Sequence, residues 1–459
     1  MKTQNSFYIQ LMHQCSYMKW LLLLLTCLVL ASCKKYLDAK PDKTLAVPST
    51  LQDFQAILDN NFLNLDYPFA GDIGSDDYFL KASDLSNFST NDQLTYVWGA
   101  NAANDLDWNY AYNMIERCNV VLDGLNKNNL QGGASIKGSA LFFRGYTFFQ
   151  VANVFSLPYD AGNSNSLPGI PLRLSADITV KTTRSSMQET YQQIISDLRS
   201  SLPLLPVSPK VKTRPSKPAA YGLLARTYLV MGDYTNANKY ADSCLQLYNK
   251  LMDYNTLDST LANPLSQFND EVFFHATTSG RDGVLNPYYA RVDTNLYATY
   301  TNNDLRKHVF YTYADDGYYE FKGDYTGQSY GSLFGGIAVD EMLLIRAETY
   351  ARLGNNSNAI ADLNLLLVKR YSKSSFIPYP ENYANPLPLI LQERRKELAF
   401  RSEIRWGDLR RLNKEPQYAK TLTRVINGQI YTLPPNDKRY AWLIPVSVIQ
   451  ESGISQNTR

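Results

Sequence analysis

The chain has 459 residues, 44% of them hydrophobic, so it is long enough to bury one large core or two fused cores. With 45 Lys and Arg against 43 Asp and Glu, its net charge is +2 and no block of like charge stands alone, which argues against nucleic acid as a partner. The unusual feature is the 34 Tyr, a surplus that suits stacking on sugars or packing at wet interfaces.

An export signal begins at Met18. Lys19 supplies the positive charge that precedes such a signal, and residues 21–30 supply a short apolar run. This run is too short to span a bilayer as a stable helix. Because residues 1–17 are polar and precede a complete signal with its own methionine, we expect translation to start at Met18.

The apolar run ends in the pattern of a bacterial lipobox, Leu30-Ala31-Ser32-Cys33. We expect residues 1–32 to be removed as a signal peptide. Cys33 should then hold the mature chain to a membrane through its acyl chains, palmitate among them, because two or more chains give a stable anchor. The alternative is an uncleaved signal anchor with a chance cysteine, and it does not explain why Lys34 and Lys35 follow at once.

The first elements after the tether are a helix and an acidic loop. Ser49 and Gln52 predict a capping box at the start of the helix, with apolar residues at helical spacing behind it. The loop over residues 66–78 contains four Asp among glycines, and we expect solvated turn residues there. A calcium loop is the alternative, although the spacing fits no EF-hand. A second helix is predicted by the apolar face of Trp108, Tyr112, Ile115, Asn119 and Leu122.

Tetratricopeptide-like spacing marks two helical hairpins. The first has Ala225 before the turn Gly232-Asp233-Tyr234, then Ala237 and Ala241. The second has Ala347 before Gly354-Asn355 and Ala359 after it. A partial third begins at Leu141, with Gly145 and Phe148. Small residues at these positions let two helices approach closely, so the pattern predicts a mostly α-helical scaffold.

A long irregular portion follows the first hairpin. Between residues 285 and 330, tyrosines are interleaved with Gly, Asp and Asn without a helical period, which is typical of a functional loop insertion. The closing stretch, 427–457, mixes prolines with short apolar runs and is also expected to be irregular.

Few side chains can support catalysis or hold a metal. Beyond Cys33 the chain has only Cys118 and Cys244, so no disulfide framework is expected. Its remaining histidines are His275 and His308, which leaves little material for a zinc site or a His-assisted nucleophile. No Walker loop, dinucleotide fingerprint or nucleophile elbow is present. We therefore expect no cofactor, no metal and no catalytic residue.

The chain resembles the SusD/RagB family of nutrient-binding outer-membrane lipoproteins from Cys33 almost to its end. The landmarks are Cys33 to Asp38, Trp108 with Tyr112 and Asn119, Arg144-Gly145-Tyr146, the hairpin 219–240, Asp304-Leu305-Arg306, 344–348, 393–400 and Arg405-Trp406. Their order and spacing are far more specific than any one of them. One departure is visible after Phe400, where the family commonly continues with Glu-Gly and this chain has Arg401-Ser402-Glu403.

The resemblance implies a SusD-like fold with an N-terminal helical region over 33–255 and a C-terminal region over 256–459 that holds the ligand-binding loops. It also implies a non-enzymatic protein on the exterior of the outer membrane. Such a protein captures a glycan, or in some members a peptide, for a TonB-dependent, SusC-like transporter. A tetratricopeptide lipoprotein that scaffolds envelope assembly and a glycoside hydrolase with two carboxylates are the alternatives.

The ligand surface is expected where aromatic planes and polar groups are densest. Sugar rings stack their C–H faces on aromatic planes, and their hydroxyls need polar groups around the rim. We expect at least one of Trp98, Tyr318, Tyr319 and Tyr325 to contact the ligand.

Overall fold

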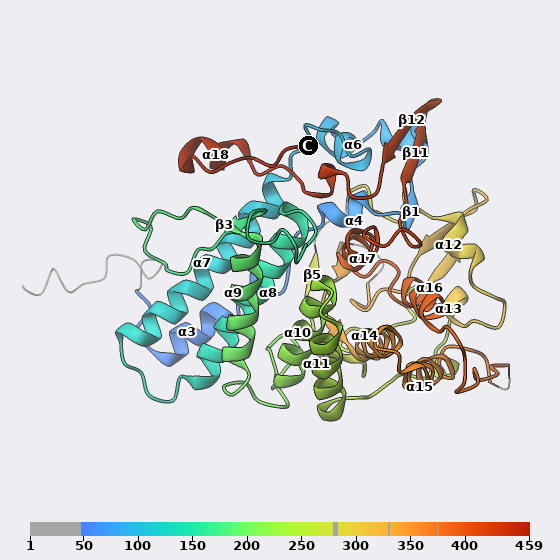
Figure 1. Cartoon of the computed structure of the whole chain (residues 1–459), viewed down its shortest axis with the longest axis horizontal. Helices are drawn as coiled ribbons and strands as arrows, with labels where there is room; N and C mark the ends of the chain where they lie inside the picture. Colours follow the sequence, from blue (N-terminus) through green and yellow to red (C-terminus); the bar gives the residue numbers. More distant parts are fainter. Residues whose placement is uncertain (1–46, 279–282, 329–330, 374) are drawn as a thin grey trace, which may run out of the picture. The chain divides into compact units, whose positions relative to one another are not determined.

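Consecutive helical hairpins form the scaffold. A computed structural model describes residues 47–278, 283–328, 331–373 and 375–459, and Thr50–Arg459 form one compact unit. Within this unit each long helix packs on the next one along the chain (Figure 1). These helices are α7 (Asp105–Lys127), α8 (Ala134–Phe155), α9 (Met187–Ser201), α10 (Lys217–Met231), α11 (Tyr234–Leu247), α14 (Val339–Arg352) and α15 (Asn356–Leu367). The expected mostly helical, tetratricopeptide-like fold is confirmed.

The hairpin of α10 and α11 has the local features that the sequence predicted. α10 ends at Gly232, whose φ of +77° lies in the left-handed region where glycine is favoured. Asp233 follows and caps α11 with its side chain. Ala225, Ala237 and Ala241 are fully buried, so no large side chain keeps the two helices apart.

The second hairpin has the same local features, and the third is interrupted by an insertion. α14 is followed by Gly354, with a φ of +81°, and Asn355 caps α15. Ala347 of α14 is fully buried. The partial third hairpin consists of α8 and α9, with an insertion between them that contains β2 (Pro168–Pro171) and β3 (Arg184–Ser186). Gly145 of α8 permits their contact, because a Cβ there would lie 3.3 Å from the side chain of Leu198.

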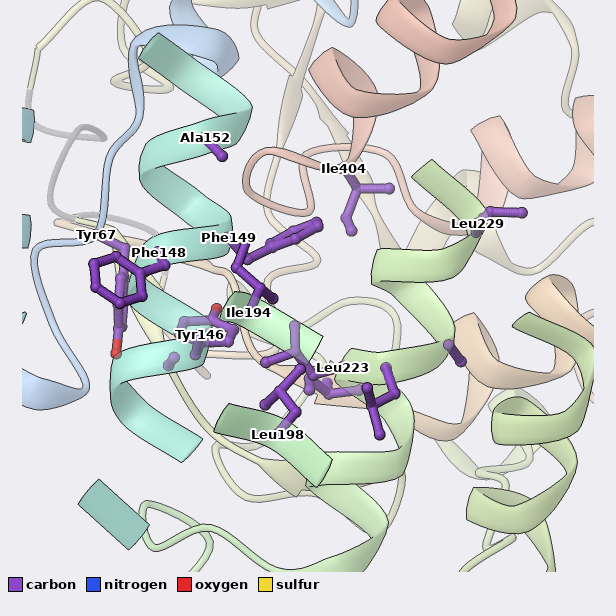
Figure 2. Close-up of a cluster of buried hydrophobic side chains, with 14 of the residues drawn as sticks. Tyr67, Tyr146, Phe148, Phe149, Ala152, Ile194, Leu198, Leu223, Leu229 and Ile404 are labelled. Carbon is purple, nitrogen blue, oxygen red and sulfur yellow. The ribbon is translucent and has the colours of Figure 1, made fainter. Parts of the chain in front are cut away.

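One continuous hydrophobic core runs through these helices. Figure 2 shows a part of it, with Phe149 of α8, Ile194 of α9, Leu223 of α10 and Ile404 of α17 (Ile404–Leu412) in the same buried cluster. Full burial of such a side chain stabilises the fold by about 1.5–3 kcal/mol relative to exposure. The shared core therefore stabilises the helical scaffold that supports the irregular segments of the chain.

The first helix begins one residue later than the sequence predicted. The N-cap of α3 (Leu51–Leu58) is Thr50, whose hydroxyl accepts the N–H of Asp53 at 3.2 Å. The Asp53 carboxylate accepts the N–H of Thr50 at 2.9 Å in return. The predicted box of Ser49 and Gln52 is therefore wrong, because Asp takes the place that Glu or Gln fills in the common motif.

The acidic loop over 66–78 is a buried segment, and the expectation of solvated turn residues is wrong. It forms the short helix α4 (Ala70–Gly74), which is buried throughout. Asp72 accepts hydrogen bonds from the hydroxyl of Ser402 at 2.6 Å and the N–H of Glu403 at 2.7 Å. Asp76 is ion-paired with Arg405 at 2.6 Å. These partners lie more than 300 residues away, so local spacing carried no sign of them.

Short antiparallel strand pairs lie in and next to the tyrosine-rich insertion. In these pairs, β1 (Tyr78–Phe79) lies beside β6 (Arg291–Val292), β4 (Val272–Phe274) beside β10 (Ile337–Ala338), β5 (Thr277–Thr278) beside β9 (Leu333–Phe334), and β7 (Tyr311–Tyr313) beside β8 (Tyr319–Phe321). The helices α12 (Thr294–Ala298) and α13 (Arg306–Val309) lie between β6 and β7 in the chain. A second hydrophobic cluster fills this region and includes Tyr300, Tyr311 and Tyr325. Many of the tyrosines therefore belong to the core of the insertion.

Buried ion pairs join α16 (Leu387–Glu397) to distant segments. The guanidinium of Arg306 contacts Asp304 at 2.8 Å, Glu393 at 2.6 Å and Glu397 at 3.0 Å. Arg370 contacts Glu397 at 2.7 Å. The charged run of α16 thus has a structural role, but its main partners come from other elements. Removing one partner of such a buried pair typically costs about 3–5 kcal/mol.

The C-terminal stretch is more regular than expected. β11 (Leu422–Ile426) and β12 (Gln429–Leu433) form a hairpin around Asn427 and Gly428, both of which have positive φ. α18 (Val446–Ser452) follows near the end of the chain. The Asn-Gly pair is a strong sequence signal for such a turn.

None of the helices in the described part of the chain combines the length and the apolar composition needed to cross a membrane. The export signal and Cys33 lie outside the described residues.

Candidate functional site

Four tyrosines form a partly exposed surface on the β7–β8 hairpin and α12, which we call the tyrosine face: Tyr297, Tyr313, Tyr318 and Tyr319. The rings of Tyr297 and Tyr319 stack with their centroids 3.8 Å apart and their planes 16° apart. Tyr313 meets Tyr319 edge-on at 5.7 Å and is 53% exposed. The pairing of Tyr313 with Tyr319 in the hairpin puts both rings on one side of the strands.

Tyr318 joins the tyrosine face to β1. Its ring meets Phe79 edge-on at 4.9 Å, and the ammonium of Lys81 lies 5.8 Å from its centroid. Lys81 is held there by an ion pair with Asp316 at 2.6 Å. The β7–β8 turn places Asp316 at this point, with Gly317 in the left-handed region at a φ of +91°.

A cavity of about 370 Å³, which we call the polar cavity, lies next to the tyrosine face. It is lined by Asp76, Tyr78, Phe79, Leu80, Tyr96, Trp98, Asp293, Asn295 and residues 420–425. Phe79 both lines the cavity and touches Tyr318, and Asn295 shares α12 with Tyr297, so the cavity and the tyrosine face adjoin. A volume of several hundred Å³ with aromatic walls and a few polar groups is typical of a small-ligand site.

Arg424 forms one wall of the polar cavity. Side chains alternate along β11, so Arg424 is buried while Thr423 and Val425 are exposed. Its guanidinium lies 3.5 Å from the ring centroid of Tyr96 and 4.8 Å from that of Trp98. It donates hydrogen bonds to main-chain carbonyl oxygens at the ends of α4 and α6 (Thr90–Tyr96). The wall is therefore aromatic and positively charged.

The remaining polar lining of the cavity consists of two acids, an amide, a lysine and two threonines. Burial acts to raise the pKa of Asp76, but Arg405, Arg395 and Lys420 outweigh it and hold that pKa well below its usual range. Lys420 reaches Asp76 at 2.6 Å. Asp76 is therefore a permanent anion and hydrogen-bond acceptor. It is not suited to the general-acid role that the glycoside hydrolase alternative requires.

The four ligand candidates from the sequence occupy different environments. Tyr318 and Tyr319 belong to the tyrosine face and are half-buried. Trp98 is 1% exposed, donates its indole N–H to the carbonyl of Gly74 at 2.9 Å and lines the polar cavity. Tyr325 is completely buried, and its hydroxyl contacts Glu271 and Tyr254. No face of its ring is accessible, so its burial gives no support to the expectation that Tyr325 contacts the ligand.

Several residues of the site were not singled out from the sequence. Tyr297 and Tyr313 lie within the tyrosine-rich run, but the spacing alone did not distinguish them from buried neighbours. Phe79 and Asn295 belong to no sequence motif that would indicate a ligand site. Arg424 is the exception, because the Asn427-Gly428 turn predicts the hairpin that places it.

Burial keeps the two thiols protonated and His275 neutral at pH 7. Burial raises the pKa of the Cys118 thiol to about 12, and it holds the pKa of Cys244 well above its usual range. Cys244 is packed in α11, where its thiol donates to the carbonyl of Pro218 at 3.3 Å. Burial lowers the pKa of His275 to about 4, so the ring is neutral at pH 7.

One group of carboxylates has the spacing of a metal site. Oxygen atoms of Glu271, Asp340 and Glu397 lie within 4.8 Å of one another, and all three residues are buried. Arg370 contacts Glu271 and Glu397 at 2.7 Å each, and Arg401 contacts Asp340 at 2.8 Å. These guanidinium groups already supply the positive charge that a metal ion would bring, so the group is a structural ion-pair network.

Comparison with known proteins gives consistent matches. Residues 35–229 match a family described as starch-binding and associating with the outer membrane, and residues 339–452 match the SusD family. SusD-like protein P2 of Formosa agariphila is 24% identical over 405 residues, which are 74% of this chain and 76% of that protein.

Solved structures share the fold. A SusD superfamily protein from Bacteroides thetaiotaomicron has a TM-score of 0.73 and 23% identity over 89% of this chain and 100% of its own. A laminarin-binding SusD-like protein has a TM-score of 0.63 and 18% identity over 88% of this chain and 97% of its own. At these identities the likeness shows the fold alone.

Proposed function

Because this chain belongs to the SusD/RagB family, we propose that it is a lipoprotein of the outer membrane that binds a glycan at the cell surface and passes it to a TonB-dependent, SusC-like transporter. The family description names starch binding and association with the outer membrane, and one relative of the same fold binds laminarin. Both support a glycan as the ligand. The lipid anchor on Cys33 is part of the proposal.

The observation that carries the proposal is the tyrosine face beside the polar cavity. Stacked and edge-on rings, one of them more than half exposed, offer a surface to the C–H faces of sugars. Asp76, Asp293 and Asn295 line the adjoining cavity, where they can accept or donate hydrogen bonds to hydroxyl groups. Apolar planes next to hydrogen-bonding groups are the two ingredients that a carbohydrate site needs.

Alanine substitution tests the site. Tyr313→Ala and Tyr319→Ala each remove an accessible ring, and we expect each to weaken glycan binding about tenfold, which corresponds to roughly 1.4 kcal/mol. Calorimetry against a panel of glycans measures this effect. Tyr110→Ala is the matched control, because Tyr110 is a half-buried tyrosine of the scaffold helix α7. Wild-type affinity in both folded variants would place the site elsewhere.

The transporter partner is tested separately. Detergent extraction of cells that express the full chain, followed by affinity purification, should recover a TonB-dependent transporter as the main partner. Recovery of envelope assembly machinery in its place would favour the scaffold alternative. This result does not depend on which glycan is bound.

A further inference from the structure

We propose that the ligand of this site is an anionic glycan, one whose sugars carry carboxylate or sulfate groups. This inference rests on the proposed glycan-binding function and names the chemical class of the ligand. It comes from cationic side chains at the tyrosine face and the polar cavity that either share one carboxylate with a second cation or have no carboxylate partner among the described residues.

The first cationic position is shared between Lys81 and Arg291. The Lys81 ammonium and the Nε of Arg291 contact the same oxygen of Asp316, at 2.6 and 2.7 Å. One carboxylate therefore serves two cations, and one positive charge is left over. The Lys81 ammonium lies above the ring of Tyr318, so the surplus charge is next to a surface on which a sugar can stack.

The second position is Lys307 of α13. Its ammonium lies 5.2 Å from the ring centroid of Tyr297 and donates to the amide oxygen of Asn302 at 3.0 Å. Within the described part of the chain it forms no ion pair with a carboxylate. An amide oxygen satisfies a hydrogen bond but leaves the charge in place, so both ends of the tyrosine face carry a cation.

The third position is Arg424 in the wall of the polar cavity. It is 7% exposed, and its N–H groups donate to the carbonyl oxygens of Ile73, Ser75 and Tyr96. Among residues 47–278, 283–328, 331–373 and 375–459, no carboxylate is ion-paired with it. The carbonyl dipoles carry no net charge. A charge in a partly enclosed site attracts an anion more strongly than the same charge in bulk water.

The acids at the polar cavity are matched by cations other than these three. Asp76, Asp77 and Asp293 lie against Arg395, Arg405 and Lys420, three carboxylates with three cations. Two further acids lie on the β7–β8 hairpin. Glu320 lies on the side of β8 away from Tyr319, and so away from Tyr297 and Lys307, because side chains alternate along a strand. Asp315 is exposed in the turn beside Asp316, where it offsets part of the charge at Lys81 but none of that at Lys307 or Arg424.

Affinity electrophoresis of the full chain measures how tightly it binds three polysaccharides. These are a neutral β-glucan, polygalacturonate, which carries carboxylates without sulfate, and carrageenan, which carries sulfate without carboxylates. We expect at least one acidic polymer to bind about tenfold or more tightly than the neutral one. Binding should weaken as salt rises toward about 1 M, where the screening length falls to ~3 Å. The two acidic polymers distinguish carboxylate from sulfate recognition.

Two charge-removing variants locate the effect. Lys81→Met and Lys307→Met keep an apolar chain of similar length over a tyrosine ring, and each should lower affinity for the acidic polymer about three- to tenfold. Lys239→Met is the matched control, because Lys239 lies 5.6 Å from the ring centroid of Tyr240 on the scaffold helix α11. Salt-insensitive binding of the neutral glucan alone would overturn this inference and leave the proposed function standing. Failure to bind any glycan would overturn both.

Discussion

Replacing Asp107 by Asn is expected to make the protein more stable at pH 8 and to change little at pH 4. Asp107 is buried in α7, and one of its oxygens accepts the N–H groups of Phe69 and Ala70 at 3.0 and 2.9 Å. Burial raises the pKa of its carboxyl to about 7, although the two hydrogen bonds act in the opposite direction. An Asn oxygen can accept the same two hydrogen bonds without any charge to bury.

The size of the effect on the free energy of unfolding follows from the rise in the pKa of Asp107. The carboxyl of an unfolded chain has a pKa near 3.9, so the folded protein holds this proton over about three further pH units. The native state binds more protons than the unfolded state between about pH 4 and pH 7, so the free energy of unfolding falls as pH rises through this window. At about 1.4 kcal/mol per unit, the loss attributable to Asp107 is about 4 kcal/mol at pH 8.

Urea denaturation of both proteins at several pH values between 4 and 8.5 checks this prediction. The difference in unfolding free energy between Asp107→Asn and the wild type should increase with pH and level off above pH 7. Asp105→Asn, which changes an exposed acid in the same helix, should show no such increase. A constant difference between Asp107→Asn and the wild type at every pH would refute the reasoning.

Two further predictions concern the anchor and the scaffold. Cys33→Ala should leave unprocessed precursor or release the protein from the membrane fraction, and retention of the variant through detergent extraction, as for the wild type, would contradict the lipobox. Ala225→Trp and Ala347→Trp should each lower the free energy of unfolding by about 1–3 kcal/mol, because each introduces a large ring where helices touch. Unchanged melting temperatures in both variants would argue against the close contact of the hairpins.

The helical scaffold was predictable because its signals are local. Gly232 and Gly354 end helices, and small residues such as Ala225 and Ala347 permit close contact, so each hairpin is encoded within a short stretch of chain. The acidic loop was not predictable in this way. Asp72 meets Ser402 and Glu403 from the far end of the chain, and nothing in its local spacing indicates that it is buried.

The candidate site was predictable as a region but not residue by residue. The tyrosine-rich run contains the hairpin that carries the tyrosine face, and tyrosine suits both exposed and buried positions. The same property concealed which rings are buried. Tyr325 is completely buried and Tyr313 is half exposed, and only the packing of the folded chain distinguishes them.

Hydrogen–deuterium exchange of the full chain with and without a bound glycan tests the central claim most directly. The account predicts that a glycan selected from the panel slows exchange in residues 311–321 of the β7–β8 hairpin and 420–426 along the polar cavity. Exchange in the scaffold hairpins 217–247 and 339–367 should stay unchanged. Protection confined to those helices, with none at the tyrosine face, would contradict the account.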